Sequence, residues 1–145
     1  MSITHHPNTA GHRLLYFGRE YGERLCVTSC DDFRSRRYTY AEMLARTVQT
    51  ASLLLSAGCR KGDPVMVIAE NSVEYVLLLF ASGVLGLRLV PVDFNTAPES
   101  VRAFAGAEQP RLVFTSRADV SGALAGCGTE VREIDLLLEE GAPHP

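Results

Sequence analysis

Residues 60–95 read RKGDPVMVIAENSVEYVLLLFASGVLGLRLVPVDFN, and this stretch decides the fold. It contains two short apolar runs, VMVIA at residues 65–69 and RLVPV at residues 88–92. Between them lies a longer segment rich in Val, Leu and Phe. Short continuous apolar runs are typical of strands buried on both faces, and a longer apolar segment between them is typical of a crossover helix. The stretch therefore predicts a βαβ unit.

The ends of the predicted crossover helix are marked by polar residues and a glycine. Asn71 or Ser72 can cap its first turn, and Gly86 can end it in the left-handed conformation that glycine adopts readily. Pro91 is unexpected inside the second strand, because proline has no N–H to donate to a neighbouring strand.

The alternation of strand and helix continues towards the C-terminus. The apolar run LVFT at residues 112–115 and the segment EVREI at residues 130–134 predict two more strands. Pro98, with Thr96 as a possible cap, begins a helix that is predicted to end near residue 105, and a short helix is predicted over residues 119–125. Strands that alternate with helices predict an α/β fold, in which a mostly parallel sheet is covered by helices on both faces.

The N-terminal part has a different pattern. A short amphipathic helix is predicted over residues 10–21, and two short strands at residues 25–29 and 36–40 predict a small β-hairpin. Thr39 and Glu42 then form a capping-box pattern that begins a further helix, which Gly58 ends. The predicted core face of this helix consists of five apolar residues, namely Leu44, Val48, Ala51, Leu54 and Leu55.

Length and composition are those of one globular domain. The chain has 145 residues, of which 46% are hydrophobic, and its net charge of −3 gives no basic surface for nucleic acid. No apolar run reaches the roughly 18 residues of a membrane span, and the N-terminus lacks the basic and apolar regions of a signal peptide. We expect a flexible arm at residues 1–9, an α/β subdomain at residues 10–138, a tail at residues 139–145, and a cytoplasmic location.

The histidines and cysteines do not form a metal-binding pattern. Cys26 and Cys30 are spaced C-x3-C without a second pair, while Cys59 and Cys127 each follow a glycine. The four histidines lie near the two ends of the chain, at His5, His6, His12 and His144. We therefore expect free thiols and no metal site.

No catalytic motif stands out in the residues. The sequence has no G-x-G-x-x-G, no G-x4-G-K-[ST] and no G-x-S-x-G, and Glu70 would oppose a phosphate at the turn after residues 65–69. Glu70 and Asp93 both follow predicted strands, as acidic residues do in phospho-acceptor domains, but Lys61 precedes a strand instead of following a late one. We predict no catalytic, cofactor-binding or metal-binding residue in this chain.

Two groups of charged residues have simple structural interpretations. Glu70 and Glu74 are spaced i, i+4, and acids are favoured in the first turn of a helix by its dipole. Arg34, Arg36 and Arg37 form a small basic cluster, which we interpret as a solvated turn rather than an anion site.

The ordered set of short motifs resembles the N-terminal part of the adenylate-forming superfamily, which contains acyl-CoA synthetases and other AMP-binding ligases. YTYAEM at residues 38–43 resembles the family's T-Y-x-E-L segment. CRKGDPVMVIAENSVEYV at residues 59–76 resembles its K-G-D-x-V stretch followed by N-S-x-E. LGLRLVPVD at residues 85–93 resembles its A-G-x-x-x-V-P segment, in which a proline at the place of Pro91 is ordinary. The resemblance covers about residues 10–135.

The resemblance implies a scaffold part of a larger ATP-dependent acid–CoA ligase. ATP, Mg²⁺ and CoA are implied for the full-length parent, which would form an acyl-adenylate and then a thioester, as in fatty acid metabolism. The family's [ST]-G-[ST]-[ST]-G-x-P-K-G loop does not occur in these residues, nor does the lysine of its mobile C-terminal domain. We therefore expect this chain alone to be inactive, with the remainder of the synthetase or a complementary chain as its partner, and possible self-association.

Departures from the family pattern leave the subfamily open. Ser82 to Gly86 reads SGVLG where the family has Lys-Ala-Gly, and the segment VDFNTAPESV lacks the D-P-x-x-P form of peptide-synthetase adenylation domains. An acyl- or aryl-CoA ligase parent is the preferred interpretation. The alternative is a stand-alone α/β interaction or regulatory module that pairs with an intact synthetase.

Overall fold

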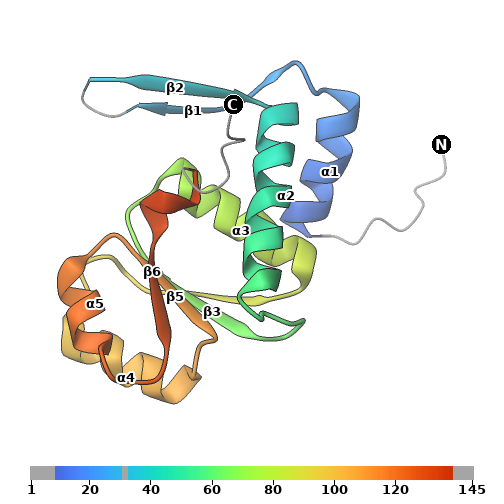
Figure 1. The fold of residues 1–145 in the computed structure, drawn as a ribbon. Helices are drawn as coiled ribbons and strands as arrows, with labels where there is room; N and C mark the ends of the chain where they lie inside the picture. The colour runs from blue at the N-terminus through green and yellow to red at the C-terminus, as the bar shows by residue number, and fades with distance from the viewer. Residues whose placement is uncertain (1–8, 31–32, 139–145) are drawn as a thin grey trace.

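A computed structural model describes residues 9–30 and 33–138. The predicted C-terminal tail and residues 1–8 of the predicted arm lie outside the described residues. Within them, a four-stranded parallel sheet is flanked by helices, and a two-stranded antiparallel hairpin lies apart from it (Figure 1). The predicted α/β fold with an N-terminal hairpin is therefore confirmed.

The parallel sheet is formed by β3 (Pro64–Ile68), β4 (Arg88–Pro91), β5 (Leu112–Thr115) and β6 (Glu130–Glu133). Their order in the sheet is β4-β3-β5-β6, so the chain passes from β3 to one neighbour and then returns across β3 to the other. The strands are short, and the side chains of β3 and β5 are buried because helices cover both faces of these central strands. The strand order therefore reverses at β3. In open parallel sheets a crevice is expected at such a point, outside the carboxyl ends of the strands.

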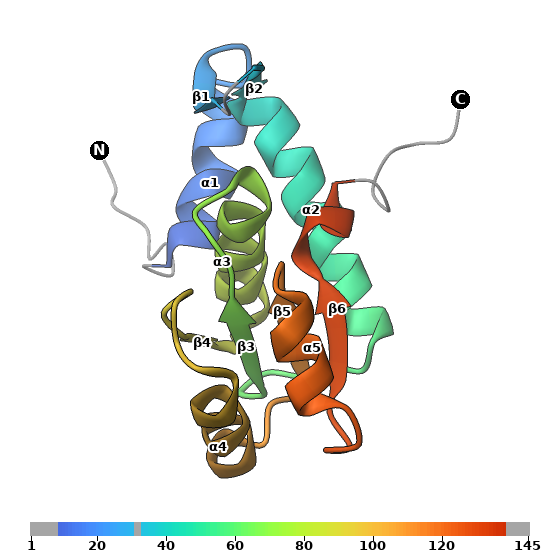
Figure 2. The same cartoon turned by 90° about the vertical axis from the view of Figure 1, so that its left-hand side faces the viewer.

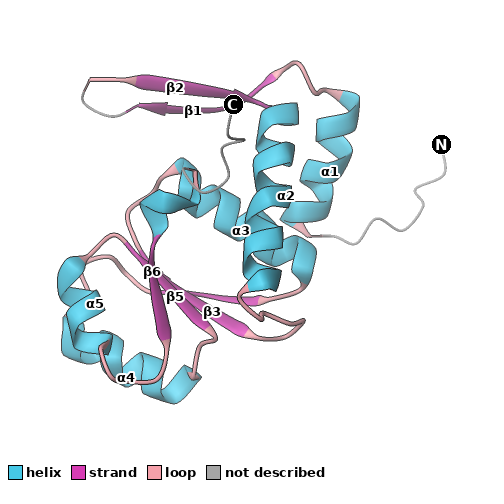
Figure 3. Ribbon diagram, in the orientation of Figure 1, coloured by secondary structure: helices cyan, strands magenta, loops and turns pink. Residues whose placement is uncertain are grey.

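Helices form the layers on both faces of the sheet (Figure 3). One layer contains α2 (Tyr40–Ser56) and α3 (Val73–Leu85), and α1 (Ala10–Glu20) packs on these two helices. The other layer contains α4 (Pro98–Glu108) and α5 (Ala118–Leu124), and a short 3-10 helix, η1 (Ile134–Leu137), follows β6. None of these described helices has the length and apolar character needed to cross a membrane.

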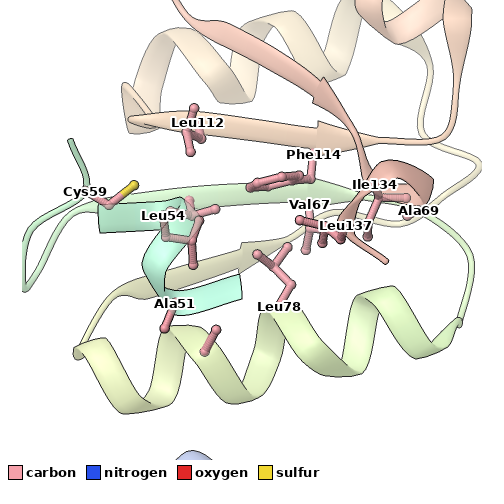
Figure 4. Packing of buried hydrophobic residues seen from close by; sticks show 12 residues of the cluster. Ala51, Leu54, Cys59, Val67, Ala69, Leu78, Leu112, Phe114, Ile134 and Leu137 are labelled. Carbon is pink, nitrogen blue, oxygen red and sulfur yellow. The ribbon is translucent and has the colours of Figure 1, made fainter. Parts of the chain in front are cut away.

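Alternate residues of the central strands supply two separate cores. Val67 of β3 and Phe114 of β5 pack with Leu54 of α2 and Leu78 of α3, as Figure 4 shows. The intervening residues Met66, Ile68 and Val113 pack against α4 and α5. This division follows from the strand period of two, because successive side chains point to opposite faces. Both faces of β3 are therefore apolar, as the run VMVIA predicted.

A third apolar cluster joins the N-terminal elements to the sheet domain. Leu14 of α1, Met43 of α2 and Leu77 of α3 are buried together, and partly buried residues of the hairpin strands β1 (Leu25–Cys30) and β2 (Ser35–Thr39) pack against them. Helix α1 approaches α3 very closely at Gly11, where an added Cβ would lie 2.4 Å from the Phe80 carbonyl oxygen. Glycine at this position therefore permits the close packing of the two helices.

Most predicted helix ends are confirmed. The Thr39 hydroxyl accepts from the Glu42 amide, and the Glu42 carboxylate accepts from the Thr39 amide, so the capping box is present. Ser72, rather than Asn71, caps α3, and Gly86 ends it with φ +68°. The prediction of Thr96 as the cap of α4 is wrong, because Ala97 holds that position without a side-chain hydrogen bond.

The proline in the second strand of the βαβ unit is explained by the sheet order. Strand β4 has only β3 as a neighbour in the described sheet, so one of its sides is open. The amides of Arg88 and Val92 donate to the carbonyl oxygens of Asp63 and Val67, on the β3 side. Successive residues of a strand direct their backbone N–H groups to alternate sides, and Pro91 is adjacent to Val92. Its nitrogen therefore faces the open edge, where proline costs no ladder bond. The prediction that residues 88–92 are buried on both faces is accordingly wrong at Arg88 and Pro91, which are exposed.

The predicted core face of α2 is wrong in its angular position. Ala51 and Leu54 are buried as predicted, but Val48 and Leu55 are 52% and 47% exposed. Met43, Thr47 and Thr50 are buried instead. The apolar pattern of α2 is wider than the surface that its neighbours cover, so periodicity alone gave the wrong boundary.

Candidate functional site

An open crevice of about 660 Å³ lies at the carboxyl end of the sheet. It lies between the segments that follow β3 and β4. Its lining consists of nine residues, namely Ala69, Glu70, Asn71, Tyr75, Pro91, Val92, Asp93, Phe94 and Asn95. In open parallel sheets ligands bind outside the carboxyl ends of the strands, so this crevice is the candidate functional site.

The structure brings together the two acidic residues that follow the predicted strands. Glu70 and Asp93 are both exposed and both line the crevice. The Asp93 carboxylate accepts from the Asn95 amide at 2.8 Å, and its carbonyl oxygen accepts from the Thr96 amide at 3.0 Å. Asp93 therefore shapes the turn that forms one wall of the crevice, as aspartates commonly do in turns.

The other acidic residue of the predicted i, i+4 pair is directed elsewhere. Glu74 lies in the first turn of α3, is buried, and accepts from the Arg36 guanidinium at 3.3 Å. This ion pair connects α3 to strand β2 of the hairpin. The interpretation of the arginine cluster as a solvated turn is therefore incorrect for Arg36, whose side chain is only 41% exposed.

Arg117 holds the wall of the crevice and was not identified in the sequence. It follows β5, and one nitrogen of its guanidinium donates to the carbonyl oxygens of Phe94 at 2.6 Å and Thr96 at 2.7 Å. The guanidinium also donates to both carboxylate oxygens of Asp119, at 3.0 and 2.6 Å. This hydrogen bonding lowers the pKa of the Asp119 carboxyl. One side chain thus connects the end of β5 to the segment after β4, although β3 lies between these strands.

Thr115, the last residue of β5, connects the end of this strand to the end of β3 below the surface. Its buried hydroxyl donates to the Ile68 carbonyl oxygen at 2.7 Å and accepts from the Arg117 amide at 3.1 Å. Burial also raises the pKa of Tyr75, whose side chain lines the crevice. The described residues thus build a shaped, hydrogen-bonded crevice with a polar rim.

A signal for Arg117 does exist in the sequence, since it comes two residues after a buried strand, but its partners are distant in the chain.

The crevice does not fit a triphosphate by itself. The two carboxylates that line it, Glu70 and Asp93, repel phosphate oxygens. The nearby cation, Arg117, already donates to two carbonyl oxygens and one carboxylate. Among the described residues, no group of three or more His, Cys, Asp or Glu side chains is placed to hold a metal ion.

The family-like K-G-D motif lies at the opposite end of the sheet. The Gly62 amide donates to the Gly86 carbonyl oxygen, and the Arg88 amide donates to that of Asp63. The Asp63 carboxylate accepts from the Arg60 amide at 2.8 Å. These contacts join the starts of β3 and β4, so the motif serves the fold and not the crevice.

Comparisons with known proteins agree with the fold and the motifs. An acyl-CoA ligase, sidI, from Aspergillus fumigatus is 26% identical over 129 residues, which is 86% of this chain and 22% of that protein. A feruloyl-CoA synthase from Amycolatopsis is 37% identical over 89 residues, covering 60% of this chain and 18% of the synthase. The chain therefore spans about a fifth of the length of these curated relatives.

The fold also matches solved structures. The N-terminal domain of FACL13 from Mycobacterium tuberculosis superposes with a TM-score of 0.81 and 24% identity, over 92% of this chain and 36% of that one. The sequence model of the AMP-binding enzyme family matches residues 16–143, which is most of the sequence. Fold, motif order and sequence match agree, and this chain belongs to the AMP-binding enzyme family.

Proposed function

We propose that this chain is the N-terminal scaffold part of an ATP-dependent acid–CoA ligase. In that reaction the carboxylate attacks the α-phosphorus of ATP and releases pyrophosphate, and the CoA thiol then displaces AMP from the acyl-adenylate. The observation that carries the proposal is the match of residues 16–143 to the AMP-binding enzyme family, together with relatives that are named as CoA ligases.

The proposed role of the chain is to supply one wall of a larger site. The crevice is shaped by Asp93 and Arg117, whereas its rim lacks a free cation for phosphate among the described residues. The lysine of the sequence, Lys61, packs its stem over Gly86 at the opposite end of the sheet. We therefore place ATP and Mg²⁺ on the remainder of the ligase, and infer that the 145 residues alone do not form an acyl-adenylate.

An acyl or aryl acid is the proposed substrate class. Support comes from relatives named as feruloyl-CoA synthase and as long-chain-fatty-acid–CoA ligase, both 37% identical over their matched segments. The cytoplasm is the proposed location, and the remainder of the synthetase is the proposed partner.

The first test is calorimetry of Mg-ATP with the 145-residue chain. The proposal expects no measurable heat of binding, because the crevice opposes phosphate. Saturable binding of Mg-ATP would overturn the inference that nucleotide is held elsewhere.

The second test follows the coding sequence beyond codon 145 and expresses the whole reading frame, or the neighbouring one, together with this chain. Formation of CoA thioesters from a panel of aryl and fatty acids, dependent on Mg-ATP, is the expected result. A reading frame that ends without a serine-, threonine- and glycine-rich loop nearby would favour the alternative, an interaction module that pairs with an intact synthetase.

A further inference from the structure

A second cavity, of about 470 Å³, lies at the end of the sheet opposite to the crevice. We call it the α4–β6 cavity, because its wall is formed by α4 and by the turn that leads into β6. Its lining consists of eight residues, namely Arg102, Ala105, Gly106, Gln109, Pro110, Cys127, Gly128 and Thr129. Figure 2 shows that β6 begins at the end where α4 lies and that the described chain leaves β6 at the other end. The cavity is therefore distant from the crevice and from the last described residues, and its volume is that of a small-molecule site.

Charge distinguishes the α4–β6 cavity from the crevice. Its lining contains the cation Arg102 and no acidic residue, whereas two carboxylates line the crevice. The acids that adjoin it in the sequence are paired elsewhere. The Glu108 carboxylate accepts from Arg88 at 2.5 Å, and the Glu130 carboxylate accepts from Arg132 at 2.6 Å. The cavity is thus positive in a chain whose net charge is −3.

Three side chains of the lining can donate hydrogen bonds to one ligand. One nitrogen of the Arg102 guanidinium donates to the Ala123 carbonyl oxygen at 3.2 Å, which holds the guanidinium between α4 and α5 and leaves its other nitrogens available. The Gln109 amide group and the Thr129 hydroxyl line the same cavity and form no hydrogen bond with the described residues. Donors from three segments of the chain suit the three terminal oxygens of a phosphoryl group.

Two residues of the lining are unfavourable for the fold alone. Gly106 lies inside α4, where glycine is less stable than alanine, and an added Cβ would meet no atom within 4 Å. Gln109 ends α4 with φ +47°, and it is the one residue other than glycine with a positive φ in the described part of the chain. Gly122 of α5 has similar free space away from the cavity, so the glycine alone indicates nothing. Two such residues at one cavity indicate a function, because the packing of the fold requires neither.

We propose that the α4–β6 cavity binds the phosphoryl group of a small phosphorylated molecule. Arg102 supplies the charge, Gln109 and Thr129 bind the remaining oxygens, and the buried residues Ala105 and Pro110 form an apolar floor for the rest of the molecule. The C-terminal ends of α4 and α5 lie nearby, and their dipoles oppose an anion. Phosphate alone therefore binds weakly, with a dissociation constant on the order of 1 mM. This proposal does not rest on the ligase proposal, because it concerns the other end of the sheet.

Titration of the ¹⁵N-labelled 145-residue chain with inorganic phosphate, followed by NMR, is the direct test. With the ionic strength held constant by sodium chloride, saturable shifts are expected at the amides of Gly106, Gln109 and Thr129. The amide of Asn95 in the crevice is expected not to shift. Sodium acetate is expected to bind at least fivefold more weakly, because a carboxylate offers two oxygens and less charge to the same donors.

Two matched pairs of variants locate the site. Arg102→Gln is expected to weaken phosphate binding at least tenfold, whereas Arg37→Gln removes the same charge from the exposed side of the distant hairpin and is expected to leave binding unchanged. Gly106→Leu fills the cavity and is expected to abolish binding. Gly122→Leu makes the same change in α5 and is expected to leave it unchanged. An added Cβ meets no atom within 4 Å at either glycine, so both variants are expected to fold, and their amide spectra check this.

Three results would each overturn the proposal. They are shifts that do not saturate at tens of millimolar phosphate, equal effects of the two members of a matched pair, and acetate that binds as tightly as phosphate. The calorimetry with Mg-ATP is repeated on Gly106→Leu, so that heat from this cavity is separated from a nucleotide site in the crevice. None of these readouts uses ligase activity, so failure here leaves the proposed function untouched.

Discussion

At the starts of β3 and β4 the backbone closes the sheet, whereas at their carboxyl ends side chains hold an open crevice. The closed end uses glycine turns and main-chain bonds, such as that from Gly62 to Gly86. The open end uses the Thr115 hydroxyl and the Arg117 guanidinium, which reach between strands. One end of the sheet therefore contributes mainly to stability, and the other shapes a surface on which a ligand or a further domain can lie.

The largest expected effect is the loss of the Thr115 hydroxyl, which forms hydrogen bonds, compared with the loss of the Thr47 hydroxyl, which forms none among the described residues. Thr115→Val removes the bond to Ile68 and leaves the Arg117 amide unpaired at the open end, so a loss of about 2 kcal/mol of unfolding free energy is expected. Thr47 of α2 is equally buried, but its hydroxyl has no partner among the described residues. Thr47→Val is the matched control and is expected to be neutral or stabilising. Urea denaturation of both variants measures the difference, and equal losses would contradict it.

Alanine substitutions at Gly86 and Gly62 test the closed end, and Gly122→Ala in α5 is their control. Gly86→Ala combines a φ of +68° with a Cβ that would lie 3.1 Å from the Lys61 stem, and a loss of about 1–2 kcal/mol is expected. Gly62→Ala shares the positive φ but meets no atom within 4 Å, so it measures the backbone cost alone. Gly122→Ala lies in α5 with open space around it and is expected to gain roughly 0.5–1 kcal/mol. Thermal denaturation that ranks the three variants differently would argue against glycine turns as the reason for this end's geometry.

Removal of the guanidinium tests whether one side chain holds the crevice wall. Arg117→Ala is expected to cost about 1 kcal/mol globally, because the carbonyls that it frees can bind water. Locally, hydrogen exchange at the amides of Asn95 and Thr96 is expected to accelerate at least tenfold. The control is Arg132→Ala, which removes an exposed pair with Glu130 on β6. If exchange at residues 95–96 is unchanged in Arg117→Ala, the wall does not depend on this residue.

The smallest expected effect is a dependence on alkaline pH at the closed end. Burial raises the pKa of the Cys59 thiol, which precedes β3. The unfolded chain releases this proton at lower pH than the folded chain does, so the contribution to stability is full below about pH 8.5 and is lost as pH rises further. Urea denaturation from pH 7 to 10 is expected to show a decline that is shallower in Cys59→Ala. Burial raises the pKa of Cys26 as well, so some decline is expected to remain.

The boundaries of the βαβ unit were predictable because their causes are local. A run such as VMVIA is apolar at every position because β3 is covered on both faces. Ser72, Gly86 and the Thr39–Glu42 capping box act within one helical turn, so their partners are visible in the sequence. The carboxyl-end position of Glu70 and Asp93 also followed from strand ends alone.

The sequence by itself therefore determined the α/β class, the helix ends and the motif order that indicates the AMP-binding enzyme family. The tertiary structure alone decided the strand order, the Arg117 bridge, the Arg36–Glu74 ion pair and the outward position of Val48 and Leu55. The physical reason is the range of the interactions. Caps and strand periodicity depend on neighbours within a few residues, whereas a guanidinium that contacts carbonyls 21 and 23 residues away, or a helix face left uncovered, depends on how the elements pack.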